Sequence, residues 1–200
     1  MKKLSVFLAI TLLFAAAMAA QEKAKGSELT TVSSVDLNKY KGKWFEIARY
    51  PNRFQKKCVG NTTATYNLKD GGGIEVINEC LKKDGKLDVA KGKARIVDEE
   101  SNAKLEVRFA PPFLSFLPFV WGDYWVIDLA KDYSYAVVGD PSREYLWILS
   151  RTPELETSVY QGILRRVEEK GFEPSKIIET PQNVEVIKGQ VVTVPLTENP

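Results

Sequence analysis

The strongest constraint on the fold is a series of short segments in which apolar and polar residues alternate. Eight such segments follow one another at the spacing of β-hairpins, at residues 42–50, 62–68, 74–81, 87–97, 103–110, 124–129, 134–138 and 145–150. Alternation of this kind is typical of a strand that buries one face. Because short turns such as Asp70-Gly71-Gly72-Gly73 link most neighbours, consecutive strands should pair. We therefore predict an all-β fold, an eight-stranded antiparallel up-and-down barrel with room for one small ligand.

Trp44 and Arg151 lie at the two ends of this series and are the candidates for closing the barrel. Gly42 allows a tight turn into the first strand, and Trp44 then supplies a large apolar ring. Arg151 follows the last strand, where its guanidinium can cover the indole face, an interaction worth roughly 0.5–2 kcal/mol when partly desolvated. Taken by themselves, the two residues fit an ordinary core aromatic and an ordinary surface charge better. The strands between them favour the closing role.

The chain after the last strand predicts one C-terminal helix packed outside the barrel. Thr152 as the N-cap and Pro153 at the first helical position mark its start, and Lys170-Gly171 marks its end. A single apolar stripe runs between them, at Leu155, Val159, Tyr160, Ile163, Leu164 and Val167. Residues 172–181 predict a last edge strand, so the barrel domain should span 36–181. Residues 182–200 form a C-terminal extension for which the sequence indicates no function.

Residues 1–20 have the features of a cleaved signal peptide. Lys2 and Lys3 precede an apolar run that is short for a membrane span and ends in small residues. We expect cleavage near Ala20 and a protein that is periplasmic or secreted. Because no cysteine stands at that site to carry a lipid, we expect a soluble protein, at most peripheral at the outer membrane. Residues 21–35 are polar and predict a flexible arm with little to bury.

Cys58 and Cys80, the only cysteines, predict a disulfide bond in the oxidising compartment that export implies. Zinc is the alternative reading of paired cysteines, but the chain has no histidine and no third thiolate to complete such a site. We therefore expect no metal and no cofactor. The net charge of +2, with 27% charged residues of both signs, provides no basic face of the kind that nucleic acids require.

The inward-facing positions of the predicted strands are the candidates for ligand binding. Alternation places inward the residues Ala64, Tyr66, Val76, Asn78, Leu105, Val107 and Phe109. In the fourth segment the inward residues are small, among them Ala90 and Gly92, which leaves space inside the barrel.

Residues 111–121 form the least polar link of the chain. The segment holds three prolines and four aromatic rings and carries no charge, so it is neither a regular helix nor an ordinary solvated turn. Its apolar side chains are Phe113, Leu114, Phe116, Leu117, Phe119 and Trp121. In an up-and-down barrel this link lies at the mouth, opposite the end that Trp44 closes. We expect it to contact a membrane surface or the ligand, and a lid or a dimer contact is the alternative.

The motifs at Gly42-x-Trp44, Asp132-Tyr133 and Arg151 resemble the three motifs of the lipocalins. Segments such as 65–68, 105–109, 124–127 and 146–151 are similar to strands of apolipoprotein D and the bacterial lipocalins, and the resemblance covers about 37–181. It implies a calyx lined by Tyr66, Phe109, Tyr124 and Trp147, with Val126 on the same face as Tyr124. It also implies carriage of a hydrophobic small molecule, in bacteria a fatty acid or lysophospholipid connected with envelope lipid maintenance.

Two other classes of protein are alternatives to a carrier. Without histidine, Ser-His and Cys-His catalysis is excluded; a lipid-modifying enzyme that uses paired carboxylates in the same barrel remains the alternative. An integral outer-membrane barrel needs a continuous lipid-facing apolar band, whereas Glu75, Glu79 and Lys91 fall on the outward positions. We therefore expect a binding protein and not an enzyme. The sequence predicts no oligomeric state.

Overall fold

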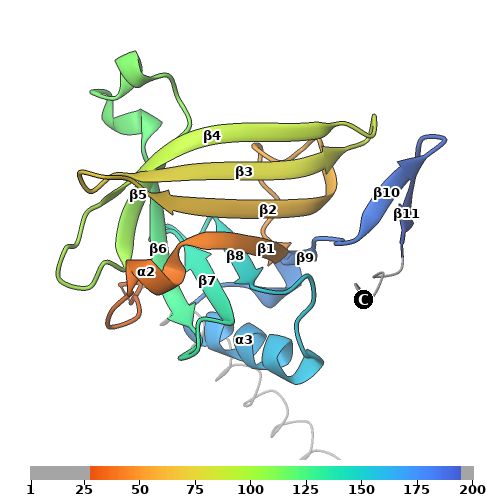
Figure 1. The fold of residues 1–200 in the computed structure, drawn as a ribbon. Helices are drawn as coiled ribbons and strands as arrows, with labels where there is room; N and C mark the ends of the chain where they lie inside the picture. Colours follow the sequence, from red (N-terminus) through yellow and green to blue (C-terminus); the bar gives the residue numbers. More distant parts are fainter. Residues whose placement is uncertain (1–27, 195–200) are drawn as a thin grey trace, which may run out of the picture.

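The computed structural model describes residues 28–194 and contains the predicted barrel (Figure 1). Its eight strands are β1 (Gly42–Arg49), β2 (Cys58–Leu68), β3 (Ile74–Lys82), β4 (Leu87–Ile96), β5 (Lys104–Arg108), β6 (Gly122–Leu129), β7 (Tyr135–Gly139) and β8 (Leu146–Ser150). Each strand pairs antiparallel with the next, and β8 pairs with β1, which closes the barrel. The predicted fold class is confirmed. The predicted signal peptide lies outside the described residues.

The seam between β1 and β2 is completed by the C-terminal part of the chain. β1 pairs with β2 only as far as Phe45↔Thr63, and farther along it pairs with β9 (Ile178–Glu179). The Asn61 amide donates to the Pro181 carbonyl at 2.8 Å. The Gln182 side-chain amide donates to the carbonyls of Glu46 and Thr62, at 2.7 and 3.0 Å. Residues 178–184, here called the C-terminal strap, therefore join two strands that no longer pair directly.

The short helix α2 (Leu37–Tyr40) covers one end of the barrel beside Trp44. Its N-cap Asp36 accepts a hydrogen bond from the Asn38 amide at 2.9 Å. Before it, Leu29 and Val35 are buried, and the Val32 amide donates to the Val126 carbonyl at 3.0 Å. The expectation that the N-terminal arm has little to bury is therefore wrong for residues 28–35, because apolar residues among the polar ones attach it to the barrel.

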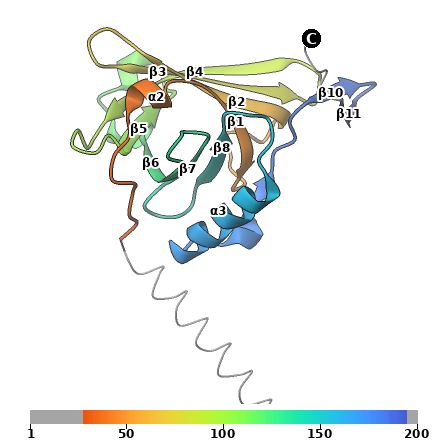
Figure 2. The same ribbon diagram turned by 60° about the horizontal axis from the view of Figure 1, so that its bottom comes forward.

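Helix α3 (Thr157–Glu169) lies against the outside of the barrel, as predicted (Figure 2). Ile163 and Val167 are fully buried against outward residues of the sheet, among them Val137 and Ile148. The predicted start of the helix was wrong, because its N-cap is Glu156 and not Thr152. The Thr152 hydroxyl donates to the Glu154 carbonyl at 2.6 Å and so forms a local turn instead of capping the helix.

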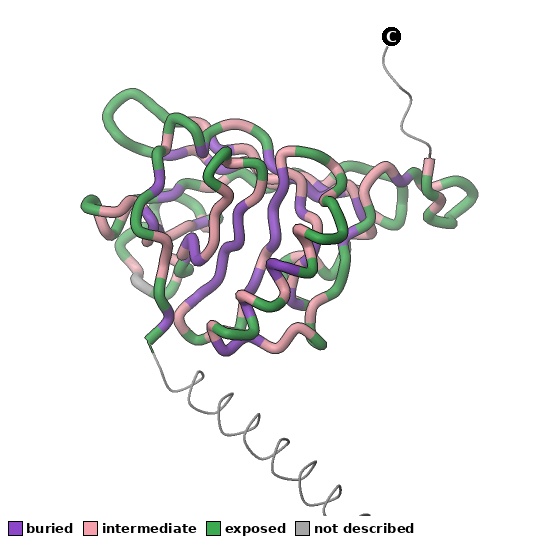
Figure 3. The backbone as a smooth tube through the Cα atoms, turned by 90° about the horizontal axis from the view of Figure 1, so that it is seen from below, coloured by how far each residue is buried: buried purple, intermediate pink, exposed green. Residues whose placement is uncertain are grey.

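The C-terminal extension forms a hairpin of β10 (Val184–Ile187) and β11 (Gln190–Thr193) that projects from the barrel (Figure 1). The remaining short elements are three 3-10 helices, η1 (Pro112–Leu114), η2 (Pro118–Val120) and η3 (Pro174–Lys176). Burial is concentrated in the central strands, and the links are mostly exposed (Figure 3). None of the helices within residues 28–194 is both long enough and apolar enough to cross a membrane.

Candidate functional site

The closed end of the barrel is held by Trp44 and Arg151 in the predicted arrangement. Trp44 is fully buried, and the Arg151 guanidinium lies 3.7 Å from the centre of its ring. Arg151 also donates to the carbonyls of Lys39, Tyr40, Lys41 and Lys43, at 2.6–3.1 Å. Gly42 has φ +92°, a conformation that disfavours side chains. One arginine thus joins the entry to β1 with the end of β8.

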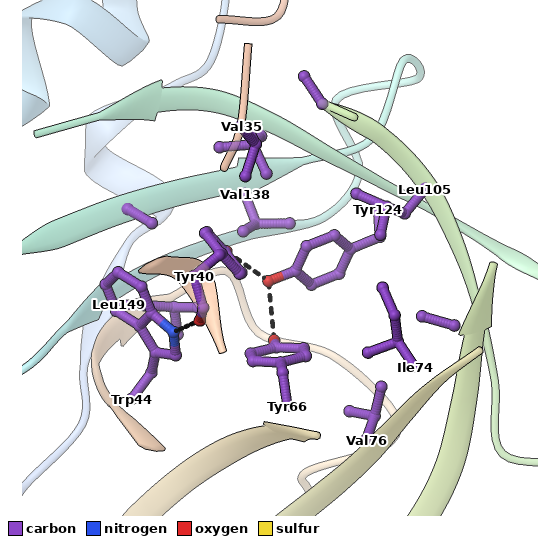
Figure 4. Packing of buried hydrophobic residues seen from close by; sticks show 14 residues of the cluster. Val35, Tyr40, Trp44, Tyr66, Ile74, Val76, Leu105, Tyr124, Val138 and Leu149 are labelled. Carbon is purple, nitrogen blue, oxygen red and sulfur yellow. Dashed lines mark hydrogen bonds between the residues drawn. The ribbon is translucent and has the colours of Figure 1, made fainter. Parts of the chain in front are cut away.

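Three tyrosines form the floor of the barrel above this closure (Figure 4). The Tyr124 hydroxyl lies 2.8 Å from the Tyr40 hydroxyl and 2.7 Å from the Tyr66 hydroxyl. Burial raises the pKa of Tyr40, Tyr66 and Tyr124, so all three remain neutral at physiological pH. The cavity at this level measures only about 20 Å³, enough for one water molecule. The floor is therefore packed and cannot itself hold an acyl chain.

The inner wall is accessible nearer the mouth. Asn78 pairs with Ala90, and Val76 with Gly92, on the same face as the interior cluster. Ala90 is exposed, and Asn78 and Gly92 are half-buried, although all three face inward. A Cβ on Gly92 would lie 2.7 Å from the Phe109 ring, which places this ring, 43% exposed, over the inner face. We call the surface formed by Asn78, Ala90, Gly92, Phe109 and the half-buried Trp147 the mouth-side wall.

The predicted ligand residues therefore fall at two levels. Tyr66, Val76, Leu105, Tyr124 and Val126 are buried in and around the floor. Ala64, Asn78, Val107, Phe109 and Trp147 are half-buried or exposed, although Val107 also lines the small cavity at the floor. Alternation correctly assigns residues to the inner face, but it carries no information on how deep the packing extends. The ligand-binding role of both groups stays a prediction.

A β-bulge in β1 brings a charged pair onto the inner wall. Glu46 pairs with Leu149 of the interior cluster, but the register then shifts so that Ala48 faces α3 and Arg49 lies opposite Trp147. Regular alternation from Trp44 would place Arg49 outside, so sequence reasoning missed it. Glu46, in contrast, shares the inward parity of Trp44 and could have been found by that signal.

Glu46 is 3% exposed and is held mainly by neutral donors. The Thr180 hydroxyl donates to Oε1 and the Gln55 side-chain amide to Oε2, both at 2.6 Å. Arg49 Nε lies 3.5 Å from Oε1. Burial raises the pKa of Glu46, although these three neighbours act in the opposite direction. Two neutral donors and one cation thus surround the Glu46 carboxylate. The alternative of an enzyme with paired carboxylates would require a second carboxylate in their place.

Gln55 connects Glu46 to the mouth. Its side-chain oxygen accepts hydrogen bonds from Trp147 Nε1 at 3.1 Å and from the Asn52 side-chain amide at 2.7 Å. Trp147 also stacks on Tyr145, with ring centres 5.8 Å apart and planes within 6°. The link between β1 and β2, the last strand and the C-terminal strap therefore meet at one buried carboxylate. The sequence gives no sign of Gln55 or Thr180 here, because both lie outside regular strands.

The link at 111–121 exposes its phenylalanines to solvent and stands away from the barrel in Figure 1. Phe113, Phe116 and Phe119 are 72%, 77% and 78% exposed. The centre of the Trp121 ring lies 4.2 Å from the Arg95 guanidinium and 5.1 Å from that of Arg108. Its indole N–H donates to the Ser115 carbonyl at 2.9 Å, and Arg108 donates to the Pro111 carbonyl at 2.8 Å. Both ends of the link are thus fixed while its rings point outward.

The predicted disulfide bond between Cys58 and Cys80 is present. It joins β2 and β3 near the turn at residues 82–86, on the mouth side of the barrel.

A model of the lipocalin-like domain family matches residues 35–182. Temperature-induced lipocalin-1 of Arabidopsis thaliana is 44% identical over 158 residues, which cover 78% of this chain and 84% of that protein. The outer membrane lipoprotein Blc of Citrobacter freundii is 39% identical over 180 residues, or 89% of this chain and 96% of that protein. Apolipoprotein D of Mus musculus is 33% identical over 156 residues, or 74% and 77%.

Among solved structures, insecticyanin of the tobacco hornworm Manduca sexta shares the fold, with a TM-score of 0.60 and 23% identity. The match covers 78% of this chain and 85% of insecticyanin. The chain therefore belongs to the lipocalin family, in the group that includes the bacterial lipocalins and apolipoprotein D.

Proposed function

We propose that this lipocalin is an exported carrier that binds a hydrophobic small molecule, such as a fatty acid or a lysophospholipid, inside its barrel. The observation that carries the proposal is the accessible mouth-side wall above a packed floor. A ligand enters past the rim, lies against Phe109, Gly92, Ala90 and Trp147, and stops at Tyr66 and Tyr124. The name of the Citrobacter relative assigns that protein to the outer membrane, which supports a role for this chain in envelope lipid maintenance.

The expected affinity suits reversible carriage. Burial of about ten methylene groups at ~0.8 kcal/mol each contributes roughly 8 kcal/mol before costs. Association and ordering of the chain remove several kcal/mol of this gain, so the dissociation constant should be about micromolar. An acyl chain held at this affinity can be loaded and released without covalent chemistry.

Two matched variants on β4 test carriage. Ala90→Trp places a large ring on the mouth-side wall, whereas Val89→Trp places the same ring on the neighbouring outward position, which is 47% exposed. Displacement of the neutral fluorophore N-phenyl-1-naphthylamine by dodecanoic acid measures binding. Ala90→Trp should weaken it about tenfold or more, and Val89→Trp should leave it unchanged. Equal binding by both folded variants would contradict a ligand on the inner wall.

Peripheral contact with a membrane forms a second part of the proposal. Three phenylalanines exposed on one short link form an apolar surface that water solvates poorly. Of the two arginines at the base of the link, Arg108 is buried and Arg95 is paired with Glu106 at 2.6 Å, so the apolar rings and not these charges would carry the contact with a lipid surface. The carrier would thus meet a membrane with the same end that admits its ligand.

A further inference from the structure

We infer that Arg49 binds the anionic headgroup of the carried lipid, a carboxylate or a phosphate monoester, at the mouth end of the barrel. The inference rests on the proposed function, because it assigns a chemical class to the same ligand. It adds to that proposal a cation, the Arg49 guanidinium, which the register shift in β1 places on the inner face of the barrel.

The position of Arg49 follows from the bulge in β1. Paired residues of antiparallel strands share a face, and Arg49 pairs with Trp147, which packs on the interior cluster. Its side chain is 12% accessible. Along β1, Trp44 lies at the closed end, Glu46 above it, and Arg49 nearest the mouth. A lipid whose chain points toward the floor would therefore bring its headgroup to the level of Arg49.

The hydrogen-bonding capacity of Arg49 is not used by the protein. Arg49 Nε is buried without an acceptor, and no residue within 28–194 accepts a hydrogen bond from its guanidinium. Its contact with Glu46 is an ion pair at 3.5 Å, and Thr180 and Gln55 already donate to both oxygens of that carboxylate. A buried guanidinium N–H without an acceptor is costly. Its planar fork suits a carboxylate or a phosphate.

Glu46 weakens the attraction between Arg49 and an anionic headgroup without abolishing it. Its carboxylate is the nearest negative charge to Arg49 and repels a ligand anion. Burial raises the pKa of Glu46, so this group takes up a proton more readily than an exposed carboxyl group when a second anion arrives. Removal of the Glu46 charge should therefore strengthen the binding of anionic ligands at Arg49 and leave neutral ligands unaffected.

The test compares dodecanoic acid with dodecan-1-ol as competitors of N-phenyl-1-naphthylamine on the full chain after lipid removal. The wild type should bind the acid more tightly than the alcohol. Arg49→Gln should weaken the acid about tenfold or more, as expected for the loss of a charge-assisted hydrogen bond, and leave the alcohol unchanged. Arg49→Lys should restore part of the difference. Glu46→Gln should act in the opposite direction and tighten the acid alone.

A matched control and three outcomes separate this inference from its alternatives. Lys83→Gln removes the same charge from an exposed turn at the same end of the barrel and should change neither affinity. If Arg49→Gln lowers the affinity for neither ligand, or for both equally, the carriage proposal is retained and the headgroup site is excluded. If butanoate or inorganic phosphate competes as well as dodecanoate, the site binds small anions and not a lipid. If neither dodecyl ligand binds the wild type, carriage and the headgroup site both fall.

Discussion

At the scale of single residues, the interior of the barrel changes character at Glu46. Below this residue the wall is apolar and packed against three neutral tyrosines. At its level a buried carboxylate is held by a hydroxyl, an amide and a guanidinium from three different segments. A buried charge is tolerated only when such groups compensate the loss of water. Glu46 therefore links three segments on the mouth side of the barrel. The free-energy cost of burying it depends on whether its carboxyl group is charged.

The pH dependence of stability should reveal this cost. Because burial raises the pKa of Glu46, the folded state binds the proton of this group more tightly than the unfolded chain does. When the pH falls from 7.5 to 5, the wild type should gain stability relative to Glu46→Gln. Urea unfolding of both proteins at the two pH values measures the difference.

Glu75, a half-buried carboxyl group on the outward face of β3, provides the control for this pH effect. Hydrogen bonds from Lys69 and Asn67 lower its pKa, so its contribution is present above the unfolded value and is lost only at lower pH. The difference between the wild type and Glu75→Gln should therefore stay flat between pH 7.5 and 5. A pH-independent difference for Glu46→Gln as well would show that the Glu46 carboxyl group titrates alike in the folded and unfolded states.

Single residues also show how far sequence reasoning reaches. The Trp44–Arg151 contact could be predicted because both residues sit at fixed positions relative to strand ends. Arg49 could not, since one bulged residue reverses the face of every later side chain in the strand. Tyr66 was correctly placed inside, but its hydroxyl contact with Tyr124 depends on the distance between strands that are far apart in sequence. Local sequence patterns thus predict which face of the sheet a side chain occupies. They do not predict how deep in the barrel it lies or which residues it contacts across the barrel.

At the scale of elements, the link at 111–121 has fixed ends and exposed rings. Its prolines and two short 3-10 turns exclude a regular helix or strand. Trp121 and Arg108 attach it to β5 and β6, so Phe113, Phe116 and Phe119 are presented without being folded into the barrel. Of the alternatives that the sequence left open, a lid with its rings inside the mouth does not match this exposure.

Membrane contact through this link can be measured by flotation with vesicles of phosphatidylethanolamine and phosphatidylglycerol. Replacement of Phe113, Phe116 and Phe119 by serine should reduce the bound fraction about tenfold or more, because it removes the apolar area that would enter the interface. The control replaces three exposed apolar side chains on β4 and just after it, namely Leu87, Val89 and Val97. If both triple variants float like the wild type, the link is not the contact surface.

Elements differ in how well the sequence predicts them. The strands were found because alternation extends over their whole length. The start of α3 was misplaced because Thr152-Pro153-Glu154 has the composition of a helix start but forms a separate turn after Arg151. Because Arg151 covers Trp44 at the closed end, a connecting segment must lead from there to the outer wall before the helix can begin. Tertiary position thus outweighed local propensity.

At the scale of the whole molecule, the barrel wall is completed by the chain's C-terminal end. The C-terminal strap replaces β2 as the neighbour of β1 near the mouth, and Gln182 joins the carbonyls of both strands. The Val184 side chain packs against Gly60, where a Cβ would approach it to 2.4 Å. Thr180 reaches from the same strap to Glu46 inside. Closure near the mouth therefore depends on residues that lie 134 and 136 positions after Glu46 of β1 in the sequence.

Two truncations distinguish the strap from the hairpin beyond it. A chain that ends at Ile177 loses β9 and the hydrogen bonds of Thr180 and Gln182, at about 1 kcal/mol each. Its free energy of unfolding in urea should fall by roughly 3–5 kcal/mol. A chain that ends at Val184 keeps the strap and loses only the exposed hairpin, which should have little effect because an isolated hairpin is marginally stable. Equal stability of the two truncated chains would mean that the barrel seam closes without the strap, whereas a loss confined to the shorter chain would identify residues 178–184 as part of the barrel wall.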